Sequence, residues 1–218
     1  MKLVVLNDNE PSPGFLNDWG WSVLVEGRYR FLFDADTRGE VLLHNAHTLG
    51  VSLEGLDFAF LSHWHYDHYG GFPTVGELNP GLKLFAPPGG VRKLGRLFIV
   101  EVATPGELLP GVWTSGPIGS FEQALGIETP SGLVVIVGCS HPGADRLTEY
   151  LLRVSGYKRA YLVVGGFHYP RRRTLDRLAE MAEFIAPAHC SGNDAKAYVL
   201  NKYPEKFVSV RTGTVLEL

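Results

Sequence analysis

Three histidines and one aspartate lie within six consecutive positions of this chain, directly after a short apolar run. Side chains two residues apart on an extended segment point the same way, so His63 and His65 can converge on one point. A turn after them can bring Asp67 and His68 to a second point. Imidazole and carboxylate ligands at this spacing suit a transition metal. A polar surface loop is the weaker interpretation, because the segment joins an apolar run to the pair Gly70-Gly71.

Three further histidines each follow an apolar run and precede small or turn-forming residues. They are His141, His168 and His189. In layered α/β folds, ligands and catalytic groups collect where strands end along one edge of a sheet. Taken singly, each of these histidines would more often be an ordinary hydrogen-bonded residue. Their repeated setting favours a shared site.

The hydrophobic pattern predicts an α/β or α+β fold, with sheets covered by helices. Short runs rich in Val, Leu and Phe dominate the first half and predict strands. The second half alternates such runs with helical apolar stripes. The predicted strands are Lys2–Leu6, Trp21–Glu26, Tyr29–Phe33, Asp57–Leu61, Leu82–Ala86, Leu133–Val137, Ala160–Val164, Phe207–Val210 and a final segment at Val215–Leu218. The predicted helices are Val41–Leu49, a stripe from Ala144 to near Gly156, a stripe formed by Leu175, Leu178, Ala179, Ala182 and Ile185, and Asp194–Asn201.

Composition excludes several classes of protein. The 218 residues suit a single domain over 1–218, and the formal net charge of −3 removes the main electrostatic argument for a general nucleic-acid binder. Two cysteines cannot form a disulfide framework, which favours a reducing compartment and predicts a cytoplasmic protein. The apolar run at residues 1–6 is too short for a signal peptide or a membrane span, so no membrane association is expected.

The His-x-His-x-Asp-His core followed by Gly-Gly resembles the signature of the metallo-β-lactamase superfamily. This resemblance implies a four-layer αβ/βα sandwich with a dinuclear metal site on one edge. Within the superfamily, the sequence is similar to a branch of stand-alone metal-dependent hydrolase-like proteins that includes 7,8-dihydropterin-6-methyl-4-(ribofuranosyl)aminobenzene 5′-phosphate synthases. The narrower match rests on Gly20–Ser22, Leu32–Asp34, Asn45-Ala46, Leu49-Gly50, Leu61–Gly71, Gly138–Gly143, Gly165–His168 and Pro187–Gly192.

The resemblance also implies a set of metal ligands. In the superfamily pattern, one metal takes the first His pair and a later His, and the other takes the Asp-His pair and a final His. Carried over, His63 and His65 match the first pair, Asp67 and His68 the second, and His189 the final His. Asp67 is in addition a candidate catalytic residue.

The chain departs from this pattern in two places. No His lies between His68 and His141, so we infer that His141 completes the first site. The Gly-Asp expected after the strand at Leu133–Val137 reads Gly138-Cys139. Cys139 is therefore either a thiolate that bridges or contacts a metal, or a small buried packing residue.

Two other residues have predicted roles near such a site, and the two remaining histidines have none. His168 is assigned to substrate contact or general acid catalysis, with metal ligation as the second option. Asp34 is expected to steady a ligand histidine rather than to bind metal itself. His44 and His47 fall inside the predicted helix Val41–Leu49 and are interpreted as structural or surface residues.

A dinuclear site of this kind predicts a metal-dependent hydrolase. Two divalent metals about 3.5–4 Å apart can share a water, lower its pKa toward about 7 and polarise an ester or phosphoester bond. The ligand types suit zinc best, with manganese and iron as alternatives. No Gly-x-Ser-x-Gly nucleophile motif occurs in the sequence.

Arg171, Arg172 and Arg173 precede a predicted helix, where they oppose the helix dipole. They are therefore read either as a cluster that binds an anionic small-molecule substrate or as a solubilising surface. A synthase that joins a pterin pyrophosphate to an arylamine is the main alternative activity. A ribonuclease and a metal-binding sensor without turnover rank lower, and the oligomeric state stays open.

Overall fold

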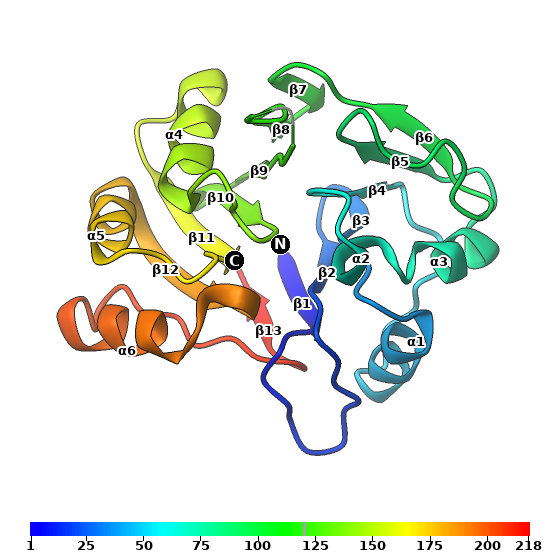
Figure 1. Cartoon of the computed structure of the whole chain (residues 1–218), viewed down its shortest axis with the longest axis horizontal. Helices are drawn as coiled ribbons and strands as arrows, with labels where there is room; N and C mark the ends of the chain where they lie inside the picture. The colour runs from blue at the N-terminus through cyan, green and yellow to red at the C-terminus, as the bar shows by residue number, and fades with distance from the viewer. Residues whose placement is uncertain (120) are drawn as a thin grey trace. The chain divides into compact units, whose positions relative to one another are not determined.

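A computed structural model describes residues 1–119 and 121–218 of the chain (Figure 1). These residues form two compact units. The first contains Met1–Val102 together with Arg211–Leu218, and the second contains Ala103–Val210. Each unit has one β-sheet and its own helices. The expectation of a single domain over 1–218 stays a prediction.

The sheet of the first unit has seven strands in the order β13-β1-β2-β3-β4-β5-β6. Strands β13, β1, β2 and β3 pair antiparallel, whereas β3, β4, β5 and β6 pair parallel. A tight turn joins β2 to β3, in which the Gly27 N–H donates to the Tyr29 carbonyl over 3.1 Å. The strands are β1 (Lys2–Asn7), β2 (Ser22–Glu26), β3 (Arg30–Phe33), β4 (Phe58–Phe60), β5 (Lys83–Ala86), β6 (Phe98–Glu101) and β13 (Val215–Glu217).

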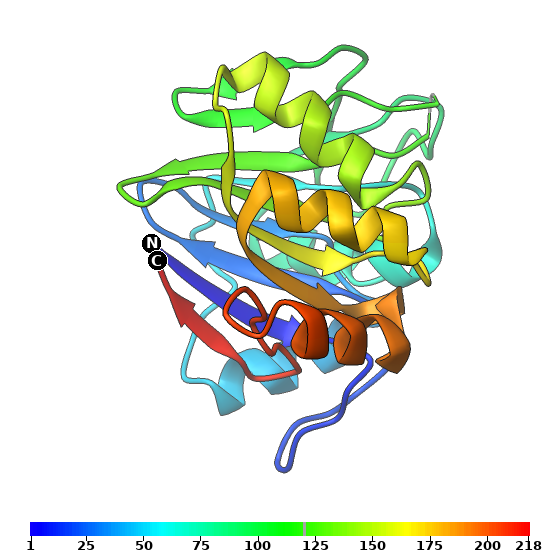
Figure 2. The same cartoon turned by 90° about the vertical axis from the view of Figure 1, so that its left-hand side faces the viewer.

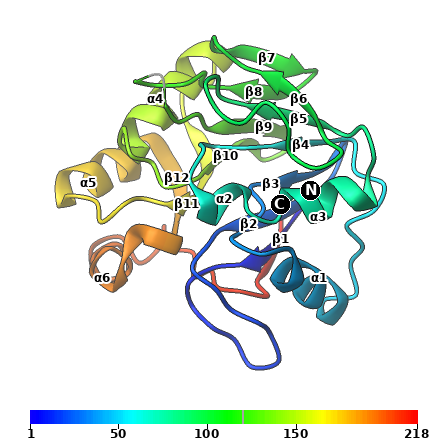
Figure 3. The same ribbon diagram turned by 45° about the vertical axis from the view of Figure 1, so that its right-hand side comes forward.

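Three helices belong to this unit: α1 (Gly39–Thr48), α2 (Tyr66–Tyr69) and α3 (Phe72–Leu78). Leu42 of α1 and Phe72 of α3 are fully buried and share one apolar core with strand residues such as Leu32. On α1, His44 and His47 are exposed, as the sequence predicted for them. Figure 3 shows the short helix α2 next to β3.

The sheet of the second unit has six strands in the order β12-β11-β10-β9-β8-β7. Strands β7 to β10 form an antiparallel series, and β10, β11 and β12 pair parallel. The continuous apolar sequences of β10 and β11 fit strands that are buried on both faces. The strands are β7 (Gly106–Leu109), β8 (Val112–Thr114), β9 (Leu125–Thr129), β10 (Gly132–Val137), β11 (Ala160–Gly166) and β12 (Ala182–Ala188).

The helices of the second unit are α4 (Ala144–Ser155), α5 (Arg172–Met181) and α6 (Asn193–Lys202), with a 3₁₀ turn η1 (His189–Ser191). Figure 2 shows the three α-helices lying along one side of this sheet. Leu151, Leu178 and Val199, one from each helix, are fully buried and share a core with the strands. Helix α4 is capped by Gly156, whose φ of 77° is a left-handed conformation that suits glycine.

Two sequence predictions of secondary structure are wrong. The apolar stripe assigned to one helix continues through Ala182 and Ile185, but α5 ends at Met181 and both residues lie on β12. Ala182 and Ile185 continue the helical spacing of apolar residues only by coincidence. The segment forms a strand because Ala182 pairs in parallel with Ala160 of β11. The predicted strand Phe207–Val210 forms only one isolated bridge, from Phe207 to Ile185.

The sequence pattern also missed β6, β7, β8 and β9, which are short and each contain a glycine or a polar residue.

Among the helices of the described residues, none combines the length and the apolar character that crossing a bilayer requires.

Candidate metal-binding site

The predicted ligands of the first unit follow two neighbouring parallel strands. Phe33 at the end of β3 pairs with Phe60 at the end of β4, and their rings stack with centroids 5.4 Å apart. Asp34 therefore leaves β3 beside the segment that leads from β4 into the histidine motif. Its N–H donates to the Phe60 carbonyl over 2.9 Å, which fixes this junction.

Asp34 is fully buried and organises the motif through its carboxylate. Oδ1 accepts the Ser62 N–H at 2.7 Å, and Oδ2 accepts the Ser62 hydroxyl at 2.7 Å. Oδ2 also lies 2.7 Å from Nδ1 of His68. The contact predicted between Asp34 and a candidate ligand histidine is thus confirmed, whereas the ligand role of that histidine stays a prediction.

These hydrogen bonds select one tautomer for two histidines. Because the Asp34 carboxylate only accepts, Nδ1 of His68 carries the proton. The Ser62 hydroxyl donates to Asp34, so it accepts at 2.9 Å from Nδ1 of His63. In each neutral ring the Nε2 lone pair is then the metal-binding electron pair. Ser62 is not among the residues predicted from the sequence, although its place beside His63 is a usable signal.

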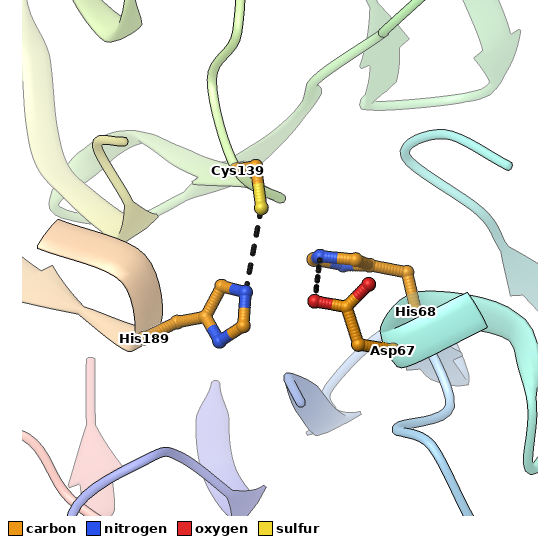
Figure 4. Close-up of side chains that lie close together, drawn as sticks. All are labelled: Asp67, His68, Cys139 and His189. Atoms are coloured by element: carbon orange, nitrogen blue, oxygen red, sulfur yellow. Dashed lines mark hydrogen bonds and ion pairs between the residues drawn. The ribbon is translucent and has the colours of Figure 1, made fainter. Parts of the chain in front are cut away.

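The structure brings the four predicted ligands of this unit together. The ring centroids of His63 and His68 are 4.2 Å apart, and those of His63 and His65 are 4.5 Å apart. His63 and His68 are fully buried, and His65 is exposed. Figure 4 shows Asp67 beside His68, with Oδ2 3.6 Å from Nε2. The turn expected after His65 is the short helix α2.

The Gly-Gly pair lets this turn lie close to the backbone after β3. A Cβ atom at Gly70 would lie 2.1 Å from the Thr37 carbonyl oxygen. A Cβ atom at Gly71 would lie 2.1 Å from the Ala35 carbonyl oxygen. Ala35 in turn donates its N–H to the His68 carbonyl over 2.7 Å. Only glycine allows this approach, which holds His68 over Asp34.

The predicted ligands of the second unit follow three neighbouring parallel strands. Val137 of β10 pairs with Gly165 of β11, which pairs with Pro187 of β12. The segments that hold Cys139, His168 and His189 therefore leave the sheet at the same edge. Each of the two histidines is in the left-handed region, with φ of 50° for His168 and 47° for His189. Such strain is often retained where function requires it.

Cys139 lies close to three predicted site residues. One potential ligand atom each from Cys139, His141 and His168 lies within 4.8 Å of the others. The Cys139 sulfur is also 3.3 Å from Nε2 of His189 (Figure 4). A hydrogen bond with Cys139 lowers the pKa of the Cys190 thiol to about 6, against the effect of burial. Cys139 is buried, which is compatible with both of its predicted roles, a thiolate that contacts a metal or a small packing residue.

Glu122 is a residue that the sequence analysis missed. This fully buried carboxylate accepts the N–H of Ser140 at 2.6 Å and the N–H of His141 at 2.7 Å. Its Oε2 also lies 2.8 Å from Nδ1 of His141, so the Nε2 of that ring is again directed toward ligation. No local pattern marks Glu122, because it lies outside the strands and 19 residues before its partner.

The arginine cluster lies at the beginning of α5. Arg171, Arg172 and Arg173 are exposed at the start of α5. The guanidinium of Arg172 lies over the Tyr198 ring, 5.3 Å from its centroid. Both residues line a cavity of about 730 Å³ between α5 and α6. Arg172 therefore has a structural contact, and a substrate role for the cluster stays a prediction.

The donor chemistry of both units fits a transition metal. Three histidines have Nδ1 held by a carboxylate or a hydroxyl, which is the usual support for an imidazole that ligates through Nε2. Together with a carboxylate and a thiol, these groups suit zinc, iron or manganese.

Known proteins resemble this chain in sequence and in fold. Residues 29–117 match the model of the beta-lactamase superfamily domain. The chain is 25% identical to the 7,8-dihydropterin-6-methyl-4-(beta-D-ribofuranosyl)-aminobenzene-5'-phosphate synthase of Methanocaldococcus jannaschii, over 93% of this chain and 91% of that protein. A solved metal-dependent hydrolase of the beta-lactamase superfamily is 26% identical, covers 100% of this chain and 99% of its own, and has a TM-score of 0.82. Zn²⁺-bound PqqB from Methylobacterium extorquens shares the fold, with a TM-score of 0.62 and 14% identity over 100% of both chains.

Sequence and fold thus both resemble the metallo-β-lactamase superfamily, through the domain match over residues 29–117 and the similarity to a solved hydrolase of that superfamily. The resemblance of the histidine motif and the predicted fold class are thereby confirmed, with two sheets that are each flanked by helices.

Proposed function

We propose that this protein is a metal-dependent hydrolase that cleaves an ester or phosphoester of a small anionic molecule. Two divalent metal ions, preferentially zinc, are its proposed cofactors. The observation that carries the proposal is the Asp34–Ser62 hydrogen-bond network, which presets Nε2 of His63 and His68 for ligation. The proposed ligands are His63, His65, Asp67, His68, Cys139, His141 and His189.

When bound, such ions lower the pKa of water toward about 7 and polarise the bond under attack. The protein's own groups then have separate tasks. Asp34, through His68, and Glu122, through His141, hold ligand rings in a fixed orientation and tautomer. Because these rings are ordered before the substrate binds, no free energy is lost in ordering them in the substrate complex.

Two side chains are proposed to move protons. Asp67 is only partly buried, so its carboxylate can accept the proton that the attacking water loses. His168 is exposed, and its ring centroid lies 4.4 Å from that of His141. In the proposed reaction its imidazolium donates a proton to the departing oxygen, so that water adds across the cleaved bond.

A metal-loading experiment tests this proposal. We expect purified protein supplied with zinc to retain up to two ions per chain by elemental analysis, and to hydrolyse at least one compound in a screen of carboxylic esters and phosphoesters. His68→Ala should lose bound metal and activity. His44→Ala is the matched control, because His44 is exposed on α1 and should leave both unchanged. Equal metal content in native protein and His68→Ala would contradict the ligand assignment.

A synthase activity is the second candidate. It is favoured by the similarity to a protein named as a synthase, which extends over 93% of this chain. In that reaction an arylamine nitrogen displaces pyrophosphate from a dihydropterin pyrophosphate and loses a proton. Pyrophosphate release that requires the arylamine would support the synthase, whereas release in water alone would support the hydrolase.

A further inference from the structure

Two exposed aromatic residues of the second unit adjoin candidate site histidines. The Phe121 side chain is 38% exposed, and its ring meets the His141 ring edge to face with centroids 5.2 Å apart. Tyr169 is 70% exposed and directly follows His168, with ring centroids 6.5 Å apart. Both rings are therefore exposed beside candidate site histidines, where a substrate bound by those histidines can meet them.

The Tyr169 ring is held in place by its backbone and by a glycine. Tyr169 has a φ of 46°, directly after the left-handed His168. Its N–H donates to the Cys190 carbonyl over 3.0 Å, which locks this conformation. A Cβ atom at Gly192 would lie 3.0 Å from Cδ1 and Cε1 of Tyr169, so the ring lies directly on the glycine. A strained backbone thus presents an exposed ring in one position.

The position of Phe121 is fixed through its neighbour. Glu122 is fully buried and accepts hydrogen bonds from the N–H groups of Ser140 and His141. The backbone at Phe121 is therefore anchored to the same segment that carries His141. Neither aromatic residue has a task in the metal chemistry proposed above.

We propose that Phe121 and Tyr169 form a recognition surface for a planar aromatic group of the substrate. This inference rests on the proposed function, because it assigns the substrate class of the same site. Aromatic groups bind each other in offset-stacked or edge-to-face arrangements that an alkyl group cannot reproduce. The substrate class is then an aryl-bearing ester or phosphoester rather than a purely aliphatic one.

Binding of two non-hydrolysable anions separates this inference from catalysis. Phenylphosphonate and methylphosphonate share a charged group and differ only in the ring. We expect zinc-loaded native protein to bind phenylphosphonate more tightly by calorimetry. Tyr169→Leu and Phe121→Leu should each reduce this preference by about 3- to 10-fold, and Tyr169→Phe should retain it. Phe98→Leu is the matched control, because Phe98 is 61% exposed on β6 of the other unit.

The outcomes distinguish the two proposals. If native protein binds both phosphonates equally, or binds neither, the aromatic surface is refuted. If it hydrolyses esters but the two leucine variants keep the native preference, the surface is refuted and the hydrolase stands. If no ester is cleaved but the variants lose the phenyl preference, the surface stands and the hydrolase fails. Unchanged thermal unfolding of the leucine variants, expected for exposed side chains, excludes misfolding as the cause.

Discussion

Asp34 and Glu122 are buried carboxylates that serve the same purpose in different units. Asp34 accepts the N–H of Ser62, and Glu122 accepts those of Ser140 and His141. Each carboxylate also contacts Nδ1 of a histidine, His68 for Asp34 and His141 for Glu122. A buried carboxylate without such partners would be strongly unfavourable. The bonds therefore stabilise the charge and at the same time orient an imidazole.

Glu122→Gln tests this role of the carboxylate. Gln has one acceptor oxygen in place of two, so its NH₂ group must face a backbone N–H or Nδ1 of His141. The variant should bind zinc about 10- to 100-fold more weakly, as when other groups that support metal ligands are removed. Affinity is measured by competition with a chromophoric chelator. Asp176→Asn is the control, because the Asp176 carboxylate on α5 is bonded to Lys202 and Tyr203 and not to a candidate ligand. Equal losses in both variants would contradict the prediction.

The two readings of Cys139 predict different spectra. If its thiolate contacts the metal, cobalt-loaded native protein should show a sulfur-to-cobalt charge-transfer band, and Cys139→Ala should lose the band. That variant should also bind metal at least about 10-fold more weakly, because it removes a ligand rather than a supporting group. Cys190→Ala, at the other buried cysteine, should keep the band. A native protein without this band would leave Cys139 as a packing residue.

At the scale of elements, the turn α2 depends on close backbone packing. The Gly71 N–H donates to the Ala35 carbonyl over 3.0 Å, at the point where a side chain would clash. The Cβ atom of an alanine at position 71 would displace α2 from the end of β3. Because α2 carries Asp67 and His68, its displacement would also disturb the candidate ligands.

Gly71→Ala should therefore lower the free energy of unfolding by about 1–3 kcal/mol, as overpacking generally does. Gly27→Ala is the control, because its nearest neighbour would be the flexible Met1 side chain at 3.2 Å. Its effect should stay within about 0.5 kcal/mol. Urea denaturation measures both values, and similar losses in the two variants would argue against the steric explanation.

Strand and helix assignment from sequence succeeded where one local signal dominated. The apolar run of β10 and the stripe of α4 each predicted an element that the structure contains. The stripe after α5 failed at Ala182, where the chain pairs with β11 in place of continuing the helix. Local periodicity could not reveal this, because the deciding partner is a strand distant in sequence.

For the whole molecule, metal binding should contribute to stability. Ligands gathered from segments distant in sequence are together only in the folded chain, so metal binding favours folding. Zinc at 100 times its dissociation constant should add about 2.7 kcal/mol and raise the melting temperature, and a chelator should reverse the increase. His63→Ala should lose this increase, whereas His47→Ala, at an exposed position of α1, should retain it. An equal increase in both variants would place the metal elsewhere.

The sequence by itself determined the histidine motif and its Gly-Gly pair, because those residues are neighbours along the chain and one turn brings them together. It also indicated Asp34, since an acidic residue at the end of an apolar strand is a local signal. Only the tertiary structure decided the role of Glu122 and the position of Cys139 against His189. For Cys139 and His189 the physical reason is that parallel strands align their carboxyl ends, which brings together side chains that no sequence spacing relates. Glu122 lies outside the strands and reaches His141 through hydrogen bonds across 19 positions of the chain.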